Sequence, residues 1–468
     1  MSTVVRALLP PSRPRGPWVA LQLLPIVALT IPASVVLAGP LKSNGWPARL
    51  MVFWIAAAVA LGWVQQKRPR RSSPVEYGCW LLLLGLACSL AASWLRALDP
   101  VEAAGAIRYA LVMFPLPVVA LGIAATATPR LCDRLLLALL IGAALSSFVA
   151  VAQFVVPFEW SDLFQIPGLD AHGTAQMMRD EFLRVRGASD HPIEFGVLAG
   201  AVTPIGLHFA RFGPTRLGRQ LAAIGTFVCI AAIPMSVSRS GILVLLLALA
   251  TYAVVLTGQQ RLVALVLGLA GLVMFRATVP GLLGTVLGAF RNSSEDTSIA
   301  SRTRAYAAVY DLVESSPVLG YGLGTFRPEL YIYLDNQYLM SLVEGGIVLV
   351  GCVIVWLLLG LASARGAARR ARDAVAASRA QAVLGATLAI GVSGAFFDLF
   401  SFGQATIMLF VLVGVAGALW HDGVLHGRPL PSPLERTGLR RTGTADPAPP
   451  APPSAPVGAL AASPGGVP

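Results

Sequence analysis

Long apolar runs dominate the chain, and short polar or basic stretches separate them. A helix that spans a membrane needs about 20 mostly apolar residues. Runs of this kind predict about twelve spanning helices, at 18–38, 47–64, 77–95, 109–126, 135–157, 192–210, 220–236, 240–257, 261–280, 339–362, 382–399 and 404–420. A tight turn at 236–239 separates the seventh from the eighth. The pattern predicts an all-α polytopic membrane protein.

The segments between these runs suggest a simple domain plan. Residues 1–17 form a basic N-terminus, and the apolar run after it is read as a first helix rather than a cleaved signal. Residues 18–420 form the transmembrane domain, with long loops at 158–191 and 281–338, the second of them before the tenth helix. The tail, 421–468, is rich in Pro and Ala, and we expect it to be disordered.

Composition excludes a soluble fold. Of the 468 residues, 56% are hydrophobic and 12% are charged, whereas soluble domains carry about 25% charge. The net charge of +12 does not indicate a nucleic-acid partner here, because 22 of the 35 Lys and Arg residues fall on the side of the two termini. Basic loops stay in the cytoplasm. We therefore expect both termini to be cytoplasmic.

Metal or cofactor chemistry is not expected. The five cysteines form no Cys-x-x-Cys pair and lie in or beside apolar runs, which is typical of packing residues. No His, Asp or Cys set has the spacing of metal ligands.

The remaining polar residues gather on the side opposite the termini, in four clusters. They are Arg184–Pro192, Ser238–Gly241, Ser301–Tyr306 followed by Ser316–Phe326, and Leu334–Leu339 followed by Glu344. Arg239 between two membrane helices is either an anchor that snorkels to the headgroups or a fixed charge for an anion.

The third cluster has two interpretations as well. Residues 296–315 have the spacing of a short amphipathic helix, with Arg302 and Arg304 near its start. Those arginines either bind an anion at the helix N-terminus or form a solvated cap. The glycines that follow are a weak phosphate-loop signal and are more typical of a bent, closely packed backbone: Gly320, Gly322 and Gly324.

Together these clusters resemble the bacterial O-antigen ligase and Wzy-type O-antigen polymerase superfamily over about 180–350. The residues that carry the resemblance are Arg-Gly-x-x-x-His-Pro at 186–192, Ser-Arg-Ser-Gly at 238–241, the glycine-rich run at 316–326, and Asp-Asn-Gln-Tyr-Leu at 335–339 with Glu-Gly-Gly at 344–346. The resemblance implies a membrane-embedded, GT-C-like, metal-independent and inverting glycosyltransferase. Its donor is a saccharide on polyprenyl (undecaprenyl) diphosphate, and its site faces outward.

The resemblance also suggests roles for individual residues. Diphosphate is already a good leaving group, so arginines that stabilise its charge are sufficient. The candidates for diphosphate contact are Arg186, Arg239, and Arg302 or Arg304. Ligases carry His-Asn where this chain has Asp335-Asn336. Asp335 is therefore the first candidate for the catalytic base, and His191 is the second. Supporting residues are Asn336, Tyr338, Glu344 and Gly322.

The aspartate favours a polymerase of lipid-linked repeat units for a surface polysaccharide or exopolysaccharide. A ligase that transfers glycan to a lipid core is the alternative. We expect a glycan donor, a glycan acceptor and membrane lipids as partners, with a chain-length regulator and a flippase, and no nucleic acid. A secondary transporter is a weaker alternative, because the two halves of the chain do not match and charges within the spans are scarce.

Overall fold

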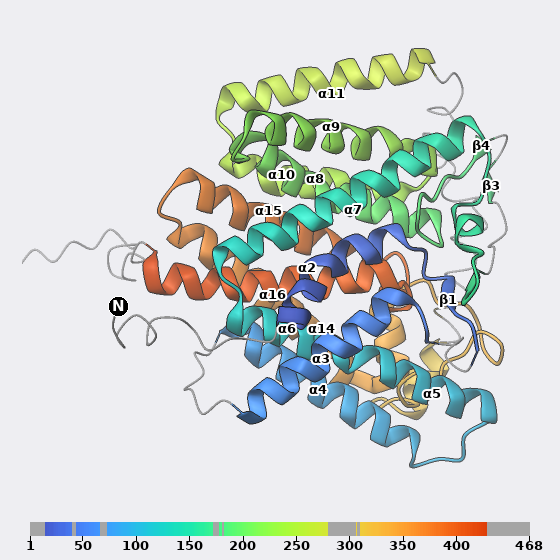
Figure 1. Ribbon diagram of the computed structural model, residues 1–468. Helices are drawn as coiled ribbons and strands as arrows, with labels where there is room; N and C mark the ends of the chain where they lie inside the picture. The colour runs from blue at the N-terminus through green and yellow to red at the C-terminus, as the bar shows by residue number, and fades with distance from the viewer. Residues whose placement is uncertain are drawn as a thin grey trace, which may run out of the picture. The chain divides into compact units, whose positions relative to one another are not determined.

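The computed structural model describes residues 15–39, 44–65, 73–171, 177–179, 182–278, 306 and 309–427. All of them fall within one compact unit, Met1–Arg428. The helices of the described part are α2 Arg15–Thr30, α3 Pro47–Gln65, α4 Pro74–Ser93, α5 Pro100–Met113, α6 Pro115–Thr126, α7 Pro129–Val155, α8 Pro192–Phe212, α9 Arg216–Ala232, α10 Arg239–Tyr252, α11 Gly258–Thr278, α14 Gln337–Arg370, α15 Ala374–Ser393 and α16 Gly403–His426 (Figure 1).

The helices confirm the predicted class of fold. In the described part of the chain, eight helices are long and apolar enough to cross a membrane. Shorter apolar helices cover Gly16–Thr30, Pro47–Trp63, Arg239–Val255 and Gly258–Met274. Each predicted span overlaps one of these helices. The protein is a multi-pass α-helical membrane protein.

Short elements occupy the connections. The 3₁₀ helices are η1 Trp160–Phe164, η2 Pro234–Ser236, η3 Ala253–Val255 and η4 Leu399–Ser401. Strand β1 Val35–Leu37 pairs antiparallel with β2 Leu169–Ala171, with Val35 opposite Ala171. Strand β3 Met178–Arg179 pairs with β4 Phe182–Leu183. These ribbons cover the end of the bundle at which α8 begins.

Two boundaries differ from the sequence expectation. The first span was expected to reach residue 38, but α2 ends at Thr30 and β1 follows, because Pro32 disfavours a helical residue before it. The fourth span was expected to begin at residue 109, but α5 begins at Pro100, where Asp99 and Glu102 form a capping box. The earlier start adds two turns of helix at the edge of the bundle.

The centre of the helix packing is α16, of whose span 89% is buried. Helix α14 packs against α4, α15 and α16, while α15 also packs against α8 and α10 (Figure 1). The apolar side chains of α11 are exposed, as with Leu267 at 66% and Val273 at 70%. Such a surface is stable against lipid rather than water.

Helix α14 is broken at Gly346, whose φ of 60° and ψ of −163° are not helical. A Cβ atom there would lie 2.2 Å from the Val318 backbone. Only glycine therefore allows the loop at 316–326 to lie against the break.

Candidate functional site

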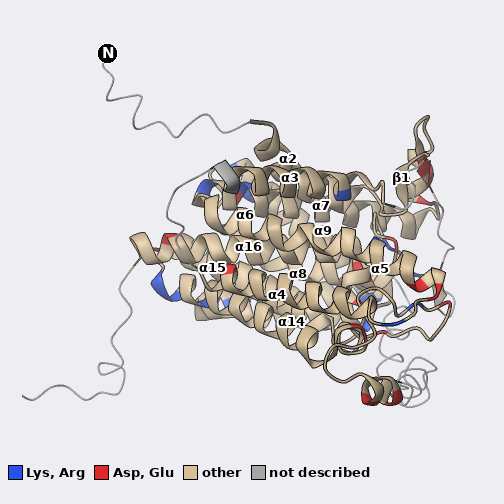
Figure 2. Cartoon of the chain, turned by 90° about the horizontal axis from the view of Figure 1, so that it is seen from below, with Lys and Arg blue, Asp and Glu red and all other residues tan. Residues whose placement is uncertain are grey.

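The starts of four helices meet at one end of the bundle. Their N-cap positions hold His191 for α8, Ser238 for α10, Asn336 for α14 and Phe402 for α16. Only the side chains of His191 and Asn336 accept a capping hydrogen bond among these four. Figure 2 shows that charged residues lie mainly toward the two ends of the helices. Because helix N-termini favour negative charge, this end is suited to an anionic ligand.

The segment before α8 is held rigidly. Gln153 of α7 accepts hydrogen bonds from the N–H groups of Gly187 at 2.9 Å and Arg186 at 3.3 Å. Ser189 donates to Gln404 of α16 at 2.6 Å, and Gln404 donates back to the Ala188 carbonyl at 2.8 Å. The segment therefore binds α7 and α16 to the start of α8.

Arg186 itself is buried at 6% exposure. Its guanidinium forms an ion pair with Glu159, a partner that the sequence did not suggest, and donates to the Asp190 carbonyl at 3.4 Å. A small cavity of about 10 Å³ beside this pair is lined by Arg184 and Arg186. Arg186 thus already has a carboxylate partner, and a diphosphate would compete with Glu159 for it.

His191 has a structural role as a cap. Its Nδ1 atom accepts a hydrogen bond from the Ile193 N–H at 3.1 Å, and its ring lies 5.7 Å from that of Phe402. Burial, with the charges of Arg184 and Arg186, lowers the pKa of His191 to about 4. An imidazole with so low a pKa is a weak base at neutral pH, so the structure favours the cap over the second base candidate.

Arg239 opens α10 next to the start of α8. The two helices touch at glycines, since a Cβ atom on Gly241 would lie 2.9 Å from the Gly196 Cα. Val237 adopts a left-handed conformation with φ of 47° to make the turn. The Ser238 Oγ atom is buried and has no hydrogen-bond partner among the residues that the structure describes. The turn thus places Arg239 and an unsatisfied hydroxyl on the α8 side of the site.

Asp335 and the residues after it form the start of α14. Asp335 is exposed, while Asn336 accepts hydrogen bonds from the N–H groups of Tyr338 at 3.0 Å and Leu339 at 3.1 Å. The Tyr338 hydroxyl donates to the Gly391 carbonyl at 2.5 Å. Asn336 and Tyr338 therefore fix the start of α14, and exposed Asp335 lies directly before it.

Asp398 is a carboxylate that the sequence analysis missed. It precedes η4 between α15 and α16, and it accepts a hydrogen bond from Ser401. Its Oδ1 atom is buried without a hydrogen-bond partner among the described residues. Burial raises the pKa of Asp398 to about 6, and the nearby charge of Asp335 adds to the rise. The sequence did contain a signal for Asp398, because an acidic residue near the end of a predicted span, 382–399, often has a functional role.

The glycine run at 316–326 is a packing element, in agreement with the second interpretation of its sequence. Gly320, Gly322 and Gly324 all have positive φ. A Cβ atom on Gly322 would lie 2.4 Å from that of Ser93 in α4. The Gly322 N–H donates to the backbone carbonyl of Glu344 at 2.8 Å, and the Glu344 carboxylate accepts backbone hydrogen bonds from Gly324 and Phe326. Gly322 and Glu344 thus position the loop.

A further network holds this loop against α5. Arg96 donates to both oxygens of Glu102, at 2.7 and 2.9 Å, and to the Tyr321 carbonyl at 3.0 Å. The Tyr331 hydroxyl donates to Glu102 at 2.8 Å. The sequence signal for this network was the Asp99-Pro-x-Glu102 capping box.

Arg302 and Arg304 lie outside the described residues, as does most of the amphipathic helix expected at 296–315. Residues 309–315 of that segment are described, and all of them are helical. The two arginines therefore stay predictions.

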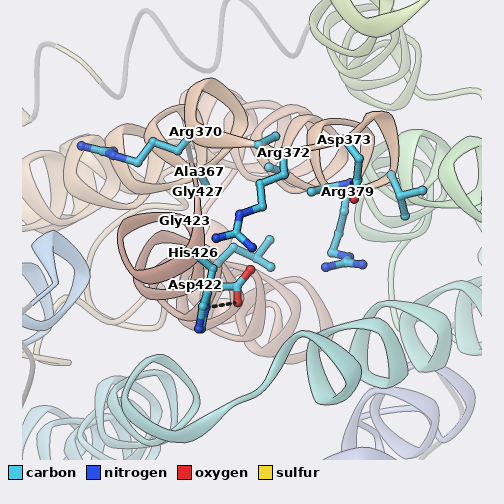
Figure 3. A pocket seen from close by; sticks show the side chains of 14 residues that line it. Ala367, Arg370, Arg372, Asp373, Arg379, Asp422, Gly423, His426 and Gly427 are labelled. Carbon is cyan, nitrogen blue, oxygen red and sulfur yellow. Dashed lines mark hydrogen bonds and ion pairs between the residues drawn. The ribbon is translucent and has the colours of Figure 1, made fainter. Parts of the chain in front are cut away.

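A larger cavity, of about 300 Å³, lies at the opposite end of α14 and α16 (Figure 3). Its charged groups already have partners: Asp422 pairs with His426 at 3.3 Å, and Arg379 pairs with Asp133 at 2.6 Å. Asp373 caps α15 by accepting from the Ala376 N–H at 2.8 Å. The cavity is distant from all the sequence motifs and does not form part of the site.

Part of the chain is similar to a known protein family. Residues 224–354 match the family model described as O-antigen ligase. The match includes Arg239, Asp335 and Glu344, whereas Arg186 and His191 precede it. No curated protein matches the chain. The part of the chain from 224 to 354 is therefore similar to the O-antigen ligase family, and this similarity agrees with the resemblance carried by the ordered motifs.

Proposed function

We propose that the protein polymerises polyprenyl-diphosphate-linked repeat units by metal-independent, inverting glycosyl transfer at the outer face of the inner membrane. The observation that carries the proposal is the meeting of four helix starts. Arg186 precedes α8 and Arg239 opens α10, while Asp335 precedes α14 and Asp398 precedes α16. This arrangement combines groups for a leaving diphosphate with carboxylates for an attacking hydroxyl.

The reaction needs a positive site for the leaving group. The acceptor hydroxyl oxygen attacks the anomeric carbon from the face opposite the diphosphate, the C–O bond to the diphosphate breaks, and the configuration inverts. Both bonding electrons leave with the diphosphate oxygen. Arg239, the N-terminus of α10 and the Ser238 hydroxyl would stabilise that charge without reorganising.

The acceptor proton passes to a carboxylate. Asp335 is exposed and available to substrate, which suits a base that must contact the hydroxyl. Asp398, whose pKa is raised to about 6 chiefly by burial, would be the second carboxylate, and its charge interacts with that of Asp335. General base catalysis of this kind contributes about 10²–10⁴-fold.

The proposed orientation of the protein in the membrane and the proposed type of acceptor rest on the sequence. The arginine-rich side that holds the termini would be cytoplasmic, which puts the site outside. Asp335 stands where ligases carry histidine, which favours a polymerase. The family description favours a ligase as the second candidate. A flippase that delivers donors and a chain-length regulator are the expected protein partners.

The decisive experiment uses purified protein in lipid nanodiscs with lipid-linked repeat units extracted from a deletion strain. A polymerase gives a ladder of longer lipid-linked glycans. A ligase instead consumes polymer only when lipid core is added. The deletion strain itself should carry single repeat units for a polymerase, or unattached full-length polymer for a ligase.

Arg239→Ala tests the leaving-group site in the same assay. We expect a loss of activity of at least 100-fold with normal membrane insertion. Arg365→Ala is the matched control, because Arg365 is an exposed arginine toward the other end of α14. Unchanged product length in Arg239→Ala would remove this arginine from the mechanism.

A further inference from the structure

An exposed tyrosine lies two residues before the candidate base. Tyr333 is 79% exposed, and Asp335 is exposed as well. Leu334 between them is 4% exposed and belongs to a small apolar cluster with Phe326 and Met340. Leu334 therefore holds one side of this segment against the protein, and Tyr333 and Asp335 lie on the open side.

The segment that carries both residues is extended. Residues 332–336, all of which the structure describes, form no helix or turn, and Asn336 has extended angles, with φ of −159° and ψ of 112°. Side chains alternate between the two sides of an extended chain, as the exposures do here. Successive side chains on one side are about 7 Å apart, which is close to the width of one pyranose ring.

The segment is fixed at both ends. At its start the Tyr331 ring stacks on the Phe326 ring, with centroids 4.9 Å apart and an angle of 17° between the planes. The Tyr331 hydroxyl also donates to Glu102 of α5 at 2.8 Å. At its end Asn336 caps α14. Tyr333 is thus presented on a short, anchored segment, and a ring held in this way loses little entropy when a ligand covers it.

The open side of the segment suits water rather than lipid. Tyrosine is common at the membrane surface, but a carboxylate is costly in lipid. Tyr333 shares its side with exposed Asp335, and Glu329, four residues earlier, has a side chain that is 58% exposed. An aromatic ring between two exposed carboxylates suits a polar ligand that also has an apolar face.

A saccharide ring has both kinds of surface. Its C–H groups can gather on one face as an apolar patch, while hydroxyl groups surround its rim. Tyrosine supplies a flat, rigid apolar area, and a carboxylate accepts hydrogen bonds from hydroxyl groups. Tyr333 and Asp335 offer these two surfaces along one side of the chain, at about the spacing of one ring.

We propose that Tyr333 stacks on the sugar that carries the attacking hydroxyl and so holds this hydroxyl at Asp335. The inference rests on the proposed glycosyl transfer and adds the residue that orients the acceptor sugar. Stacking requires a pyranose whose C–H groups gather on one face, so Tyr333 selects among acceptor sugars. The contact is present before and during the reaction, so it lowers the KM for the acceptor and leaves kcat nearly unchanged.

The test measures KM and kcat for the acceptor separately, with purified protein in lipid nanodiscs. The acceptor is a repeat unit on a fluorescent polyprenyl diphosphate, and the donor is a low, fixed concentration of unlabelled lipid-linked polymer. Product that keeps the label reports acceptor use only, because a donor loses its lipid.

For Tyr333→Leu we expect a KM about 5- to 10-fold higher for the acceptor, with kcat changed by less than about 2-fold. Leucine keeps an apolar side chain that a membrane anchor would need, but it lacks the flat ring. Tyr333→Phe keeps the ring and should keep the natural KM. Tyr310→Leu is the matched control, because Tyr310 is another exposed tyrosine before α14, at 69%, and it should keep both constants.

Binding can also be followed without turnover. The probe is the repeat-unit saccharide released from its lipid by mild acid, and the measurement is saturation transfer in NMR. With the natural protein and with Tyr333→Phe, saturation should be strongest for the C–H protons of one ring face. Tyr333→Leu should lose this pattern.

Two results would overturn the inference while leaving the proposed function intact. One is extension with equal KM values in the natural protein and Tyr333→Leu. The other is a KM that rises equally in Tyr333→Leu and Tyr310→Leu, because that would indicate a general effect of exposed tyrosines. If the natural protein extends no acceptor at all, the proposed glycosyl transfer itself fails, and the inference falls with it.

Discussion

Arg186 and Glu159 form an ion pair in which the side chains are only 8% and 19% exposed. The pair joins the residue before α8 to the connection after α7. Arg186 was predicted as a diphosphate ligand, but it also has this structural role. Its two roles can be separated by mutation.

Arg186→Ala should lower stability as well as activity. It leaves the Glu159 carboxylate half-buried without its partner, at a cost of about 1–3 kcal/mol after allowance for partial exposure. The measurement is the melting temperature in detergent alongside polymer formation.

The double variant Arg186→Ala/Glu159→Ala distinguishes the two roles. It should recover most of the lost stability, because no carboxylate is left unpaired, and it should remain inactive if Arg186 binds diphosphate. Recovery of activity together with stability would show that Arg186 acts only through the ion pair.

Gly346→Ala should disrupt the loop at 316–326. The residue needs a φ of 60°, and its Cβ atom would lie 2.2 Å from the Val318 backbone. Strain of this type costs on the order of 1–3 kcal/mol before the clash is added. Gly351→Ala, one turn later with nothing within 4 Å of its Cβ position, is the control. Equal melting temperatures for the two variants would contradict the expected clash.

Asp398 should make stability depend on pH. Its pKa in the folded protein, about 6, lies above the ordinary value of 3.8, so the folded state holds the proton more tightly than the unfolded state. The stability from this group is present below pH 3.8 and is lost as the pH rises toward 6. Melting temperatures between pH 4 and 7 check this.

Asp398→Asn should remove that slope, and Asp335→Asn should move it to lower pH, because a neighbouring negative charge is gone. If ionised Asp398 supports catalysis, the pH–rate profile of the natural protein has a rise near pH 6 that Asp398→Asn lacks. A profile that is the same in both proteins would exclude that role.

His191→Asn should keep both fold and activity. Asparagine can accept the hydrogen bond from the Ile193 N–H that caps α8, whereas alanine cannot and should cost about 0.5–2 kcal/mol. The measurement is activity normalised to folded protein for His191→Asn and His191→Ala. An inactive but stable His191→Asn would return His191 to the role of base.

Part of the site could be predicted from local sequence and part could not. Asn336 was found because it belongs to a motif at a helix start, and its side chain does cap α14. Asp398 was missed because it stands alone beside an apolar run. Its neighbour in space, Asp335, lies about 60 residues earlier in the sequence, and a one-dimensional pattern does not contain the distance between them.

The sequence by itself determined the class of fold. The bilayer requires about 20 apolar residues for each span, and that requirement is written directly in the hydropathy pattern from residue 18 to residue 420. It also marked the glycines of the 316–326 run as points of close packing.

Only the tertiary structure decided which charged side chains lie close together in space. It paired Arg186 with Glu159 and brought Asp398 close enough to Asp335 for their charges to interact. The physical reason is that Coulomb interaction falls with distance in space, and distance in space is fixed by helix packing. That packing depends on close contacts such as Gly196 against Gly241.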